Sequence, residues 1–481
     1  MLATVAMAVA GFVGAGAAFA DENYNLTVSG TGHAYDIYQI FTGSLSDGKL
    51  TDIKWGRNGT GVAGNAVDDN TLTAIAAVSG TDQAKANALK AYANLSGTAF
   101  ATVASDTAAS VPAGYYLVKD KDDSQKDKND AYSTYIVKVV GSDVTVNPKS
   151  DVPSFEKKLK DTNDTTGVTT DWQDSADYDM GDHVPFKLEG KVASNFADYD
   201  TYYFAFHDVE EKGLTFDKGS VKVYVDDAEI TSGYQLVTNP ADGCTFEVKF
   251  ANLKNVKGVK AGSKIRVEYT STLNSDAVLG QHGKVNKAKL QFSNNPNDSQ
   301  GGENGPTGET PWDDVIVFTY KAVVNKVNEK NQPLTGAEFT LARKLKDGTT
   351  QNVAVVKSAE GTAFTFNGLD DGEYVLSETK TPAGYNTIKP ITFTVTAEHT
   401  FEWNGENRDD VLTSLSGNAV SGEINFTADE SAGSLITNVV NKPGSALPET
   451  GGMGTIVLYV AGAALVIAAG VYFGLKKKST R

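Results

Sequence analysis

The stretch Val221-Lys222-Val223-Tyr224-Val225 sets hydrophobic side chains at every second position. This period of two is typical of a strand with one buried face. Short segments of the same kind, rich in aromatic or β-branched residues and bounded by Gly, Asp or Asn, recur through residues 154–320. They include Phe186 to Leu188, Tyr202 to Phe206, Phe246 to Phe250, Ile265 to Tyr269 and Ala288 to Phe292. The spacing predicts a β-sandwich and not a parallel α/β sheet.

Similar strand patterns lie on both sides of this block, and two helical patterns precede it. The expected strands are Tyr24 to Val28, Tyr35 to Phe41, Gly336 to Leu341, Gly372 to Glu378, Ile391 to Val395 and Leu435 to Val440; the expected helices are Asp69 to Val78 and Ala84 to Leu95. Gly141-Ser142-Asp143 predicts a hairpin turn between residues 133–140 and 144–146. We therefore expect a mainly β chain of tandem immunoglobulin-like β-sandwich domains, with some helix in the first domain.

The length of 481 residues is too great for one core and suggests about three domains. Polar or Pro-punctuated connectors place them at 21–150, 151–320 and 321–446. A net charge of −17 argues against nucleic acid or an anionic membrane as a partner. The single cysteine, Cys244, excludes an intramolecular disulfide, so an exported chain needs another form of reinforcement.

Both ends of the chain carry export signals. Residues 2–17 are apolar and uncharged, and Ala18-Phe19-Ala20 is a small-x-small cleavage site, which predicts a signal peptide over residues 1–20. No basic residue precedes the apolar run, so we expect the true start codon to lie upstream; an N-terminal membrane helix is the alternative.

The C-terminal segment 447–481 contains Leu447, Pro448, Glu449, Thr450 and Gly451, an uncharged apolar run of about 20 residues from Ile456, and a Lys-rich tail. The run is long enough for a transmembrane helix with a cytoplasmic basic stop. The order of the parts resembles the LPxTG cell-wall sorting signal that sortases read in Gram-positive surface proteins. An ordinary membrane anchor with a chance LPETG is the alternative.

The sequence shows no enzyme constellation. His33, His183, His207, His282 and His399 are scattered without metal-ligand spacing, and neither a phosphate-binding loop nor a nucleophile elbow appears. We therefore expect a chain that is not an enzyme and that has no cofactor or metal.

Unusual polar residues occupy apolar strand faces. Period two places Lys326 on one face with Phe318 to Val324, and Asn441 on the face of Leu435 and Val439; Glu378 follows Tyr374 and Leu376 in the same way. Burial lowers the pKa of a lysine and raises that of a carboxylic acid, giving a neutral amine beside a neutral acid. Attack of the amine on an asparagine carboxamide polarised by the acid, with loss of ammonia, would leave a Lys–Asn isopeptide bond. A strand-end lysine reaching to water is the alternative.

Two segments, 336–341 and 374–385, resemble the collagen-adhesin B-type repeat and the E-box of Gram-positive major pilins. The resemblance implies that Glu378 assists a bond between Lys326 and Asn441. Residues 172–178, 181–186 and 206–208 resemble the isopeptide-forming second domain of the same pilins. There it implies Asp208 as the acid and Lys157 as the lysine, with Lys158 as the fallback. Asn286 and Asn294 share one parity and both stay candidates, with Asn286 slightly favoured.

The sequence from Val144 to Lys149 resembles the pilin motif, whose lysine accepts the sorted C-terminus of the next subunit. Both valines, Pro148 and Lys149 are kept, while Asn147 stands where tyrosine is usual. A solvated linker lysine is the alternative for Lys149.

The resemblance as a whole implies a major pilin, polymerised by sortase through Thr450 and Lys149 and anchored to the cell wall. Its implied partners are pilus-specific and housekeeping sortases, further copies of the chain, minor tip or basal pilins, peptidoglycan, and a host glycan or matrix protein. A monomeric wall-anchored adhesin is the alternative function.

Overall fold

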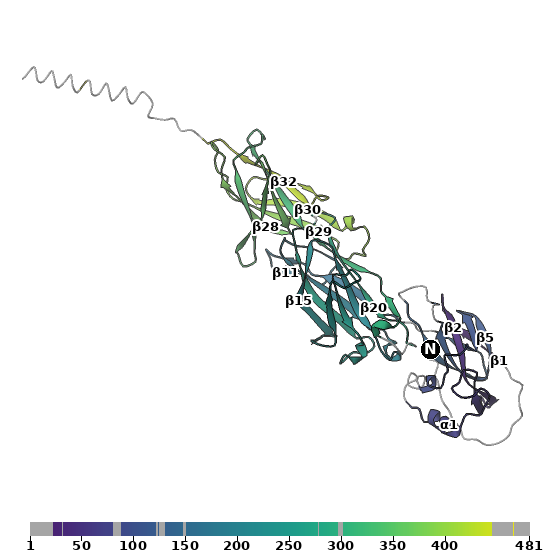
Figure 1. Ribbon diagram of the computed structural model, residues 1–481. Coiled ribbons are helices and arrows are strands. Elements are labelled where there is room, and N and C mark those ends of the chain that lie inside the picture. The colour runs from purple at the N-terminus through teal and green to yellow at the C-terminus, as the bar shows by residue number, and fades with distance from the viewer. Residues whose placement is uncertain are drawn as a thin grey trace, which may run out of the picture.

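The computed structural model describes residues 23–30, 32–79, 88–121, 124, 130–147, 151–277, 279–296, 302–444 and 465. The predicted signal peptide, Lys149, the LPETG pentapeptide and all of the predicted transmembrane segment except residue 465 lie outside these residues. Within the described part, no helix is long and apolar enough to cross a membrane. The described strands form three groups that follow one another along an elongated molecule (Figure 1).

The first group contains two sheets and one α-helix. One sheet has the order β5-β1-β8 and the other β3-β2-β6-β7, with β4 paired to β2. The elements are β1 (Asn23–Val28), β2 (Ala34–Ser46), β3 (Lys49–Trp55), α1 (Asp69–Ala76), β4 (Ala101–Ala104), β5 (Ala108–Pro112), β6 (Gly114–Asp120), β7 (Thr134–Val139) and β8 (Val144–Val146). Leu26, Ile37 and Val118 are fully buried and belong to its core.

Three local predictions for this group were wrong in detail. Helix α1 is capped by Asp68, whose side chain accepts a hydrogen bond from the Thr71 amide, and it ends at Ala76, before Val78. The second helical pattern reaches only residue 90 among the described residues, and a turn follows at 91–92. The expected hairpin is absent because β8 pairs in parallel with β1 instead of with β7. A turn sequence alone cannot specify which strand the chain joins afterwards.

The second group is a sandwich of two larger sheets. One has the path β12-β22-β20-β14-β18-β17 with β21 beside β20, and the other the path β16-β15-β19-β13-β9. The strands are β9 (Ser154–Leu159), β12 (Ser175–Asp177), β13 (His183–Lys191), β14 (Phe204–Glu210), β15 (Leu214–Val225), β16 (Ala228–Ile230), β17 (Gln235–Thr238), β18 (Phe246–Phe250), β19 (Lys264–Leu273), β20 (Lys284–Ser293), β21 (Thr307–Glu309) and β22 (Asp313–Phe318). A two-stranded ribbon, β10 (Thr162–Asn163) and β11 (Val168–Thr169), and the short helices η1 (Phe196–Asp198), η2 (Leu253–Asn255) and η3 (Gly302–Asn304) complete it.

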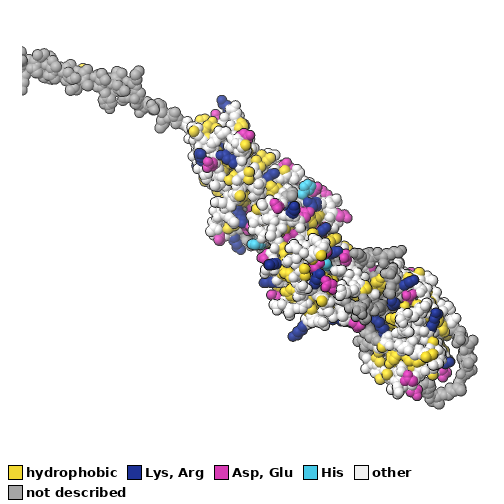
Figure 2. Space-filling view, in the orientation of Figure 1, with side chains coloured by type: hydrophobic (Ala, Val, Ile, Leu, Met, Phe, Trp, Pro, Cys, Tyr) yellow, Lys and Arg dark blue, Asp and Glu magenta, His cyan; other side chains and the backbone are white. Residues whose placement is uncertain are grey.

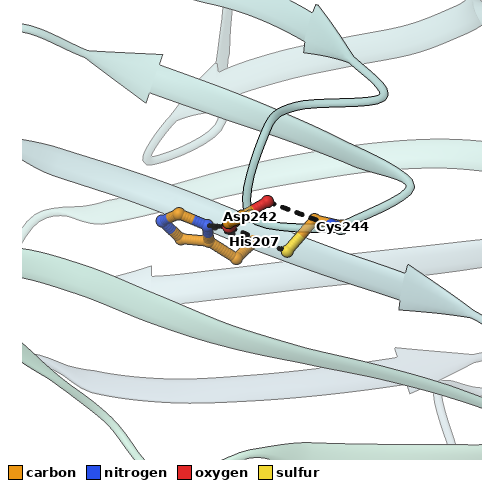
Figure 3. Close-up of side chains that lie close together, drawn as sticks. All are labelled: His207, Asp242 and Cys244. Atoms are coloured by element: carbon orange, nitrogen blue, oxygen red, sulfur yellow. Dashed lines mark hydrogen bonds and ion pairs between the residues drawn. The ribbon is translucent and has the colours of Figure 1, made fainter.

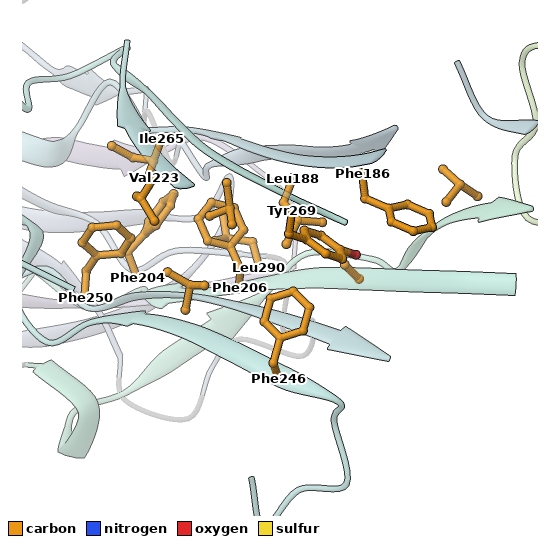
Figure 4. Packing of buried hydrophobic residues seen from close by; sticks show 14 of the residues in the cluster. Phe186, Leu188, Phe204, Phe206, Val223, Phe246, Phe250, Ile265, Tyr269 and Leu290 are labelled. Carbon is orange, nitrogen blue, oxygen red and sulfur yellow. The ribbon is translucent and has the colours of Figure 1, made fainter. Parts of the chain in front are cut away.

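Aromatic and aliphatic side chains from both sheets fill this sandwich (Figure 4). Phe186 and Tyr269 stack with ring centroids 5.3 Å apart, and Phe246 meets Tyr269 edge-on at 4.8 Å. The inward residues are those that the alternation in Val221 to Val225 predicts: Val223 and Val225 are buried. The predicted mainly β sandwich architecture is therefore confirmed.

The third group is a smaller sandwich of two five-stranded sheets, β26-β27-β23-β32-β31 and β25-β24-β28-β29-β30. Its first and last core strands, β23 and β32, lie side by side and run parallel. The elements are β23 (Tyr320–Asn328), β24 (Glu338–Lys344), β25 (Thr350–Val353), β26 (Val355–Lys357), β27 (Ala363–Leu369), β28 (Gly372–Lys380), β29 (Ile391–His399), η4 (Arg408–Asp410), β30 (Leu412–Ser421), β31 (Phe426–Asp429) and β32 (Ser434–Asn441).

Charged side chains of both signs are mixed along the face of the molecule that Figure 2 shows, and neither sign covers a whole group of strands there. Interspersed charges produce a solvated surface without a strong single-sign field. This face offers no extended basic surface of the kind that binds nucleic acid.

Candidate cross-linking sites

A lysine and an aspartate meet in the centre of the second sandwich. Lys157 on β9 and Asp208 on β14 come from opposite sheets, both are 0% exposed, and Lys157 Nζ lies 2.5 Å from Asp208 Oδ2. Lys157 points inward because it shares the parity of Leu159, which is also fully buried. A buried charge needs a close partner, and here each group has the other.

Tyr269 and Asn286 extend this contact. The Tyr269 hydroxyl donates to Asp208 Oδ2 at 2.7 Å and accepts from Lys157 Nζ at 2.8 Å. Asn286 on β20 donates from Nδ2 to the same hydroxyl at 2.9 Å and faces Glu210 Oε1 at 3.4 Å. Lysine, acid and asparagine are thus brought together around one phenol.

Burial dominates the protonation of this site. It lowers the pKa of Lys157 and raises that of Asp208, and the mutual attraction of the two groups opposes both shifts. Burial, with the Asp208 carboxylate nearby, raises the pKa of Glu210 to about 8. Burial therefore weakens the charged form of the amine and of both acids.

The third sandwich contains a second lysine–asparagine–acid group. Lys326 on β23 and Asn441 on β32 are 0% exposed, and Glu378 on β28 of the opposite sheet is 9% exposed. Asn441 donates from Nδ2 to both Glu378 carboxylate oxygens, at 2.9 and 3.1 Å. Lys326 Nζ donates to the carbonyl oxygens of Val327 and Val439, each at 2.9 Å.

The Lys326 ammonium loses its proton more readily in this setting than in water. Burial lowers the pKa of Lys326 to about 8, against a smaller opposing effect of Glu378. Glu378 contacts the nitrogen of the Asn441 amide, whereas we expected the acid to polarise the carbonyl group of that amide. The Oδ1 atoms of Asn286 and Asn441 are buried without a hydrogen-bond partner. The acid thus faces the group that would leave as ammonia.

The structure separates the favoured residues of the second sandwich from their fallbacks. Lys158 points to the other side of β9 and lies 2.6 Å from Asp174. Asn294 donates to the Asp130 carbonyl and accepts from the Tyr132 amide, at the boundary with the first group of strands. Neither of these contacts involves the Lys157–Asp208 pair.

Sequence reasoning missed Tyr269 and Glu210. The strand pattern could have indicated both residues. Tyr269 continues the inward row of Ile265 and Val267, and Glu210 shares the parity of Asp208. A polar residue at the end of a row of inward-facing residues is also the pattern from which we predicted Lys326 as a site residue.

The predicted acceptor Lys149 and the LPETG pentapeptide lie outside the described residues, but the strand that precedes Lys149 is described. Val144–Val146 forms β8, which β1 holds at the edge of the first group. Ser29 Oγ contacts Val146 O at 3.2 Å and Asn147 Oδ1 at 2.6 Å, which fixes the path of the chain up to residue 147.

Two family matches define the class of protein. Residues 321–409 match the SpaA family, described as a prealbumin-like fold domain, and residues 439–480 match the LPXTG cell wall anchor motif. A β-sandwich followed by this anchor characterises a Gram-positive surface protein held at the cell wall.

The comparisons with individual proteins then give the kind of surface protein. The trypsin-resistant surface T6 protein of Streptococcus pyogenes serotype M6 is 26% identical over 390 residues, covering 69% of this chain and 70% of that protein. The solved T6 backbone pilin aligns with a TM-score of 0.54 at 17% identity over 89% of this chain and 100% of the other, a likeness of fold. The full-length major pilin SpaD of Corynebacterium diphtheriae aligns with a TM-score of 0.49 at 17% identity, over 88% of this chain and 98% of that one. Anchor, domain and T6 relative together support a structural, sortase-assembled major pilin anchored on the cell surface.

Proposed function

We propose that this chain is the shaft subunit of a covalent pilus and is reinforced by two internal Lys–Asn bonds. The observation that carries the proposal is the pair of buried lysine–acid–asparagine groups, one in the second sandwich and one in the third. A soluble protein rarely buries lysine, and an asparagine and an acid accompany it in both sites. Such bonds replace the disulfides that a chain with one cysteine cannot form.

In the third sandwich the neutral Lys326 amine attacks the side-chain carbonyl carbon of Asn441. The new N–C bond forms as the C–NH₂ bond breaks, and one amine proton moves through Glu378 to the departing nitrogen, which leaves as ammonia. Glu378 is suited to this transfer because it already faces the amide nitrogen at 2.9 Å. The same balance holds for Lys157 and Asn286, with Asp208 as the acid and Tyr269 as a bridge.

The two bonds differ in what they join. Lys326 and Asn441 lie on neighbouring strands of one sheet, whereas Lys157 and Asn286 lie on opposite sheets. The second bond therefore closes the sandwich across its core. Asn286 is on β20, and β21 and β22 follow it, so this bond does not join the first strand of the sandwich to its last.

Polymerisation uses the residues beyond the described part of the chain. Sortase cleaves between Thr450 and Gly451, and the Thr450 carbonyl becomes a thioester on the sortase cysteine. The Lys149 amine of another copy attacks that carbonyl, an amide forms, and the sortase thiol departs. A pilus-specific sortase performs this step, minor pilins cap or root the fibre, and a housekeeping sortase transfers the last copy to peptidoglycan.

The test is the size distribution of the protein released from cell walls of a producing strain. We expect a high-mass ladder that resists SDS and that collapses to monomer in Lys149→Ala. Lys191→Ala is the matched control, because Lys191 is an exposed lysine that pairs with Ser154, the first residue of β9. A wall-anchored monomer in the unaltered strain would favour the adhesin alternative.

A further inference from the structure

His207, Asp242 and Cys244 form a compact cluster on the outer side of the second sandwich. His207 follows Phe206 on β14 and therefore faces away from the core, and the other two belong to the loop 239–245 between β17 and β18 (Figure 3). His207 Nδ1 lies 2.9 Å from Asp242 Oδ2 and 3.8 Å from Cys244 Sγ, and Cys244 Sγ lies 3.2 Å from Asp242 Oδ2.

These separations match those of ligands around one small cation. Zn–N and Zn–O bonds of about 2.0 Å and Zn–S bonds of about 2.3 Å place tetrahedral ligands roughly 3.3–3.8 Å apart. The observed range of 2.9 to 3.8 Å needs little adjustment. The mixture of imidazole, thiol and carboxylate is also the donor set that zinc prefers.

The far side of the imidazole is already arranged as in a metal site. His207 Nε2 lies 3.1 Å from Gln291 Oε1, and the Gln291 amide nitrogen contacts Thr307 Oγ1 at 2.9 Å. An acceptor at Nε2 keeps a proton on that nitrogen when a cation takes the place of the proton on Nδ1, which faces the cluster. Metal-binding histidines usually have such an outer hydrogen bond, which fixes the tautomer and the ring orientation.

Charge and access also suit a cation. A second carboxylate, Glu247, lies 3.0 Å from His207 Nδ1, so two acids face this nitrogen and can offset the charge of a cation bound there. Lys249 offsets part of this charge through Glu247 at 2.8 Å. The Asp242 side chain is 40% exposed, which leaves an entry path, while Cys244 is only 7% exposed.

A second acidic group in the described part of the chain is occupied by a side chain of the protein. Asp164, Asp179 and Asp182 surround the Arg343 guanidinium, which supplies their counter-charge. Within the part of the chain that the structure describes, no arginine forms an ion pair with the His207 cluster, which also has a sulfur ligand.

We propose that His207, Asp242 and Cys244 bind Zn²⁺, with Gln291 orienting His207. Zinc displaces the Cys244 thiol proton to solvent and ties the 239–245 loop to β14, next to Asp208. The loop is already close, because the Thr245 amide donates to the Asp208 carbonyl at 2.7 Å. His207 and Asp242 lie 35 residues apart in the sequence, so their spacing did not predict this site, and we expected no metal.

The test uses the full chain in detergent, reduced, stripped with a chelator and then exposed to zinc chloride. Native mass spectrometry should show a zinc ion that is lost in Cys244→Ser, a variant that keeps a hydroxyl for the Asp242 hydrogen bond. Gln291→Leu should weaken zinc binding by about 10- to 100-fold without removing a ligand. His282→Asn is the control, because His282 is an exposed histidine with its own aspartate partner, Asp409.

A second readout uses Co²⁺ in place of zinc. A thiolate-to-cobalt charge-transfer band should appear in the unaltered chain and be absent in Cys244→Ser, with both proteins shown to be folded by circular dichroism. The proposal is overturned if the folded unaltered chain binds no zinc. It is equally overturned if Cys244→Ser binds as much zinc as the unaltered chain, or if cobalt binds without the thiolate band.

Discussion

Lys326 and Asn441 enter the core of the third sandwich from adjacent parallel strands, with Lys326 opposite Val439, the residue two positions before Asn441. Residues two apart on a strand share a face, so the amine and the carboxamide project to the same side of the sheet. Glu378 reaches the carboxamide from the facing sheet. The three groups thus enter the same part of the core from two adjacent strands of one sheet and one strand of the other.

The role of Glu378 can be tested by intact mass. Glu378→Ala removes the acid that faces the departing nitrogen, so we expect the chain to retain one ammonia that the unaltered chain loses. Glu373→Ala is the matched control, because Glu373 lies on the same strand but pairs with Lys344. Our assignment is wrong if Glu378→Ala keeps the full mass deficit. A mass of the unaltered chain equal to its sequence would refute internal bonds altogether.

The asparagine of the second sandwich can be identified in the same way. Asn286→Ala should abolish the deficit of one ammonia from this sandwich, since Asn286 contacts the Tyr269 hydroxyl that also holds Lys157. Asn294→Ala should leave the deficit intact, because Asn294 contacts the first group of strands. The reverse pattern would exchange the two assignments. Tyr269→Phe should slow closure, because it removes the bridge while the Lys157–Asp208 contact stays.

The sequence was sufficient to predict some of these site residues but not all of them. Alternation places Lys157, Lys326, Glu378 and Asn441 inward, because parity within one strand is a local property. The choice between Asn286 and Asn294 is not local: both have the same parity, and only the pairing of β20 with β14 places Asn286 opposite Glu210.

Pairing between distant strands also explains why the hairpin prediction was wrong and why the His207 cluster was not predicted. The chain bends at residues 140–142, but β8 joins β1, about 118 residues away in sequence, by a long-range contact that no local signal encodes. The meeting of His207 with Cys244 depends in the same way on the register of β14 against β18.

The internal bond of the second sandwich should contribute strongly to stability. Residues 157 and 286 enclose a loop of more than 100 residues, and closing such a loop limits the unfolded chain by about 5 kcal/mol in the chain-entropy description. We therefore expect the free energy of unfolding of Asn286→Ala to fall by up to that amount in guanidinium titration. Asn294→Ala should lose less, since its loop stays closed. Equal losses in the two variants would show that the bond adds nothing beyond local packing.

The pKa of Lys326 predicts how an unlinked third sandwich responds to pH. In Asn441→Ala the amine stays free, with its pKa lowered by burial to about 8 from the ordinary 10.5. Between these pH values the unfolded chain binds a proton that the folded chain does not, so the free energy of unfolding should rise with pH by a few kcal/mol. Below about pH 8 the Lys326 amine is protonated in both the folded and the unfolded chain, and its contribution to the free energy of unfolding is then at its least favourable.

The measurement is a series of denaturant titrations of Asn441→Ala from pH 7 to pH 10.5. The control adds Lys326→Met to the same chain, which keeps the length of the side chain but removes the titrating amine. The difference between the two curves isolates Lys326 from other groups that titrate in this range. The free energy of unfolding of Asn441→Ala, minus that of the double variant, should increase with pH. The unaltered chain, whose Lys326 nitrogen is an amide in our proposal, should lack this increase. Parallel curves for the two variants would mean that Lys326 is not held in its neutral form.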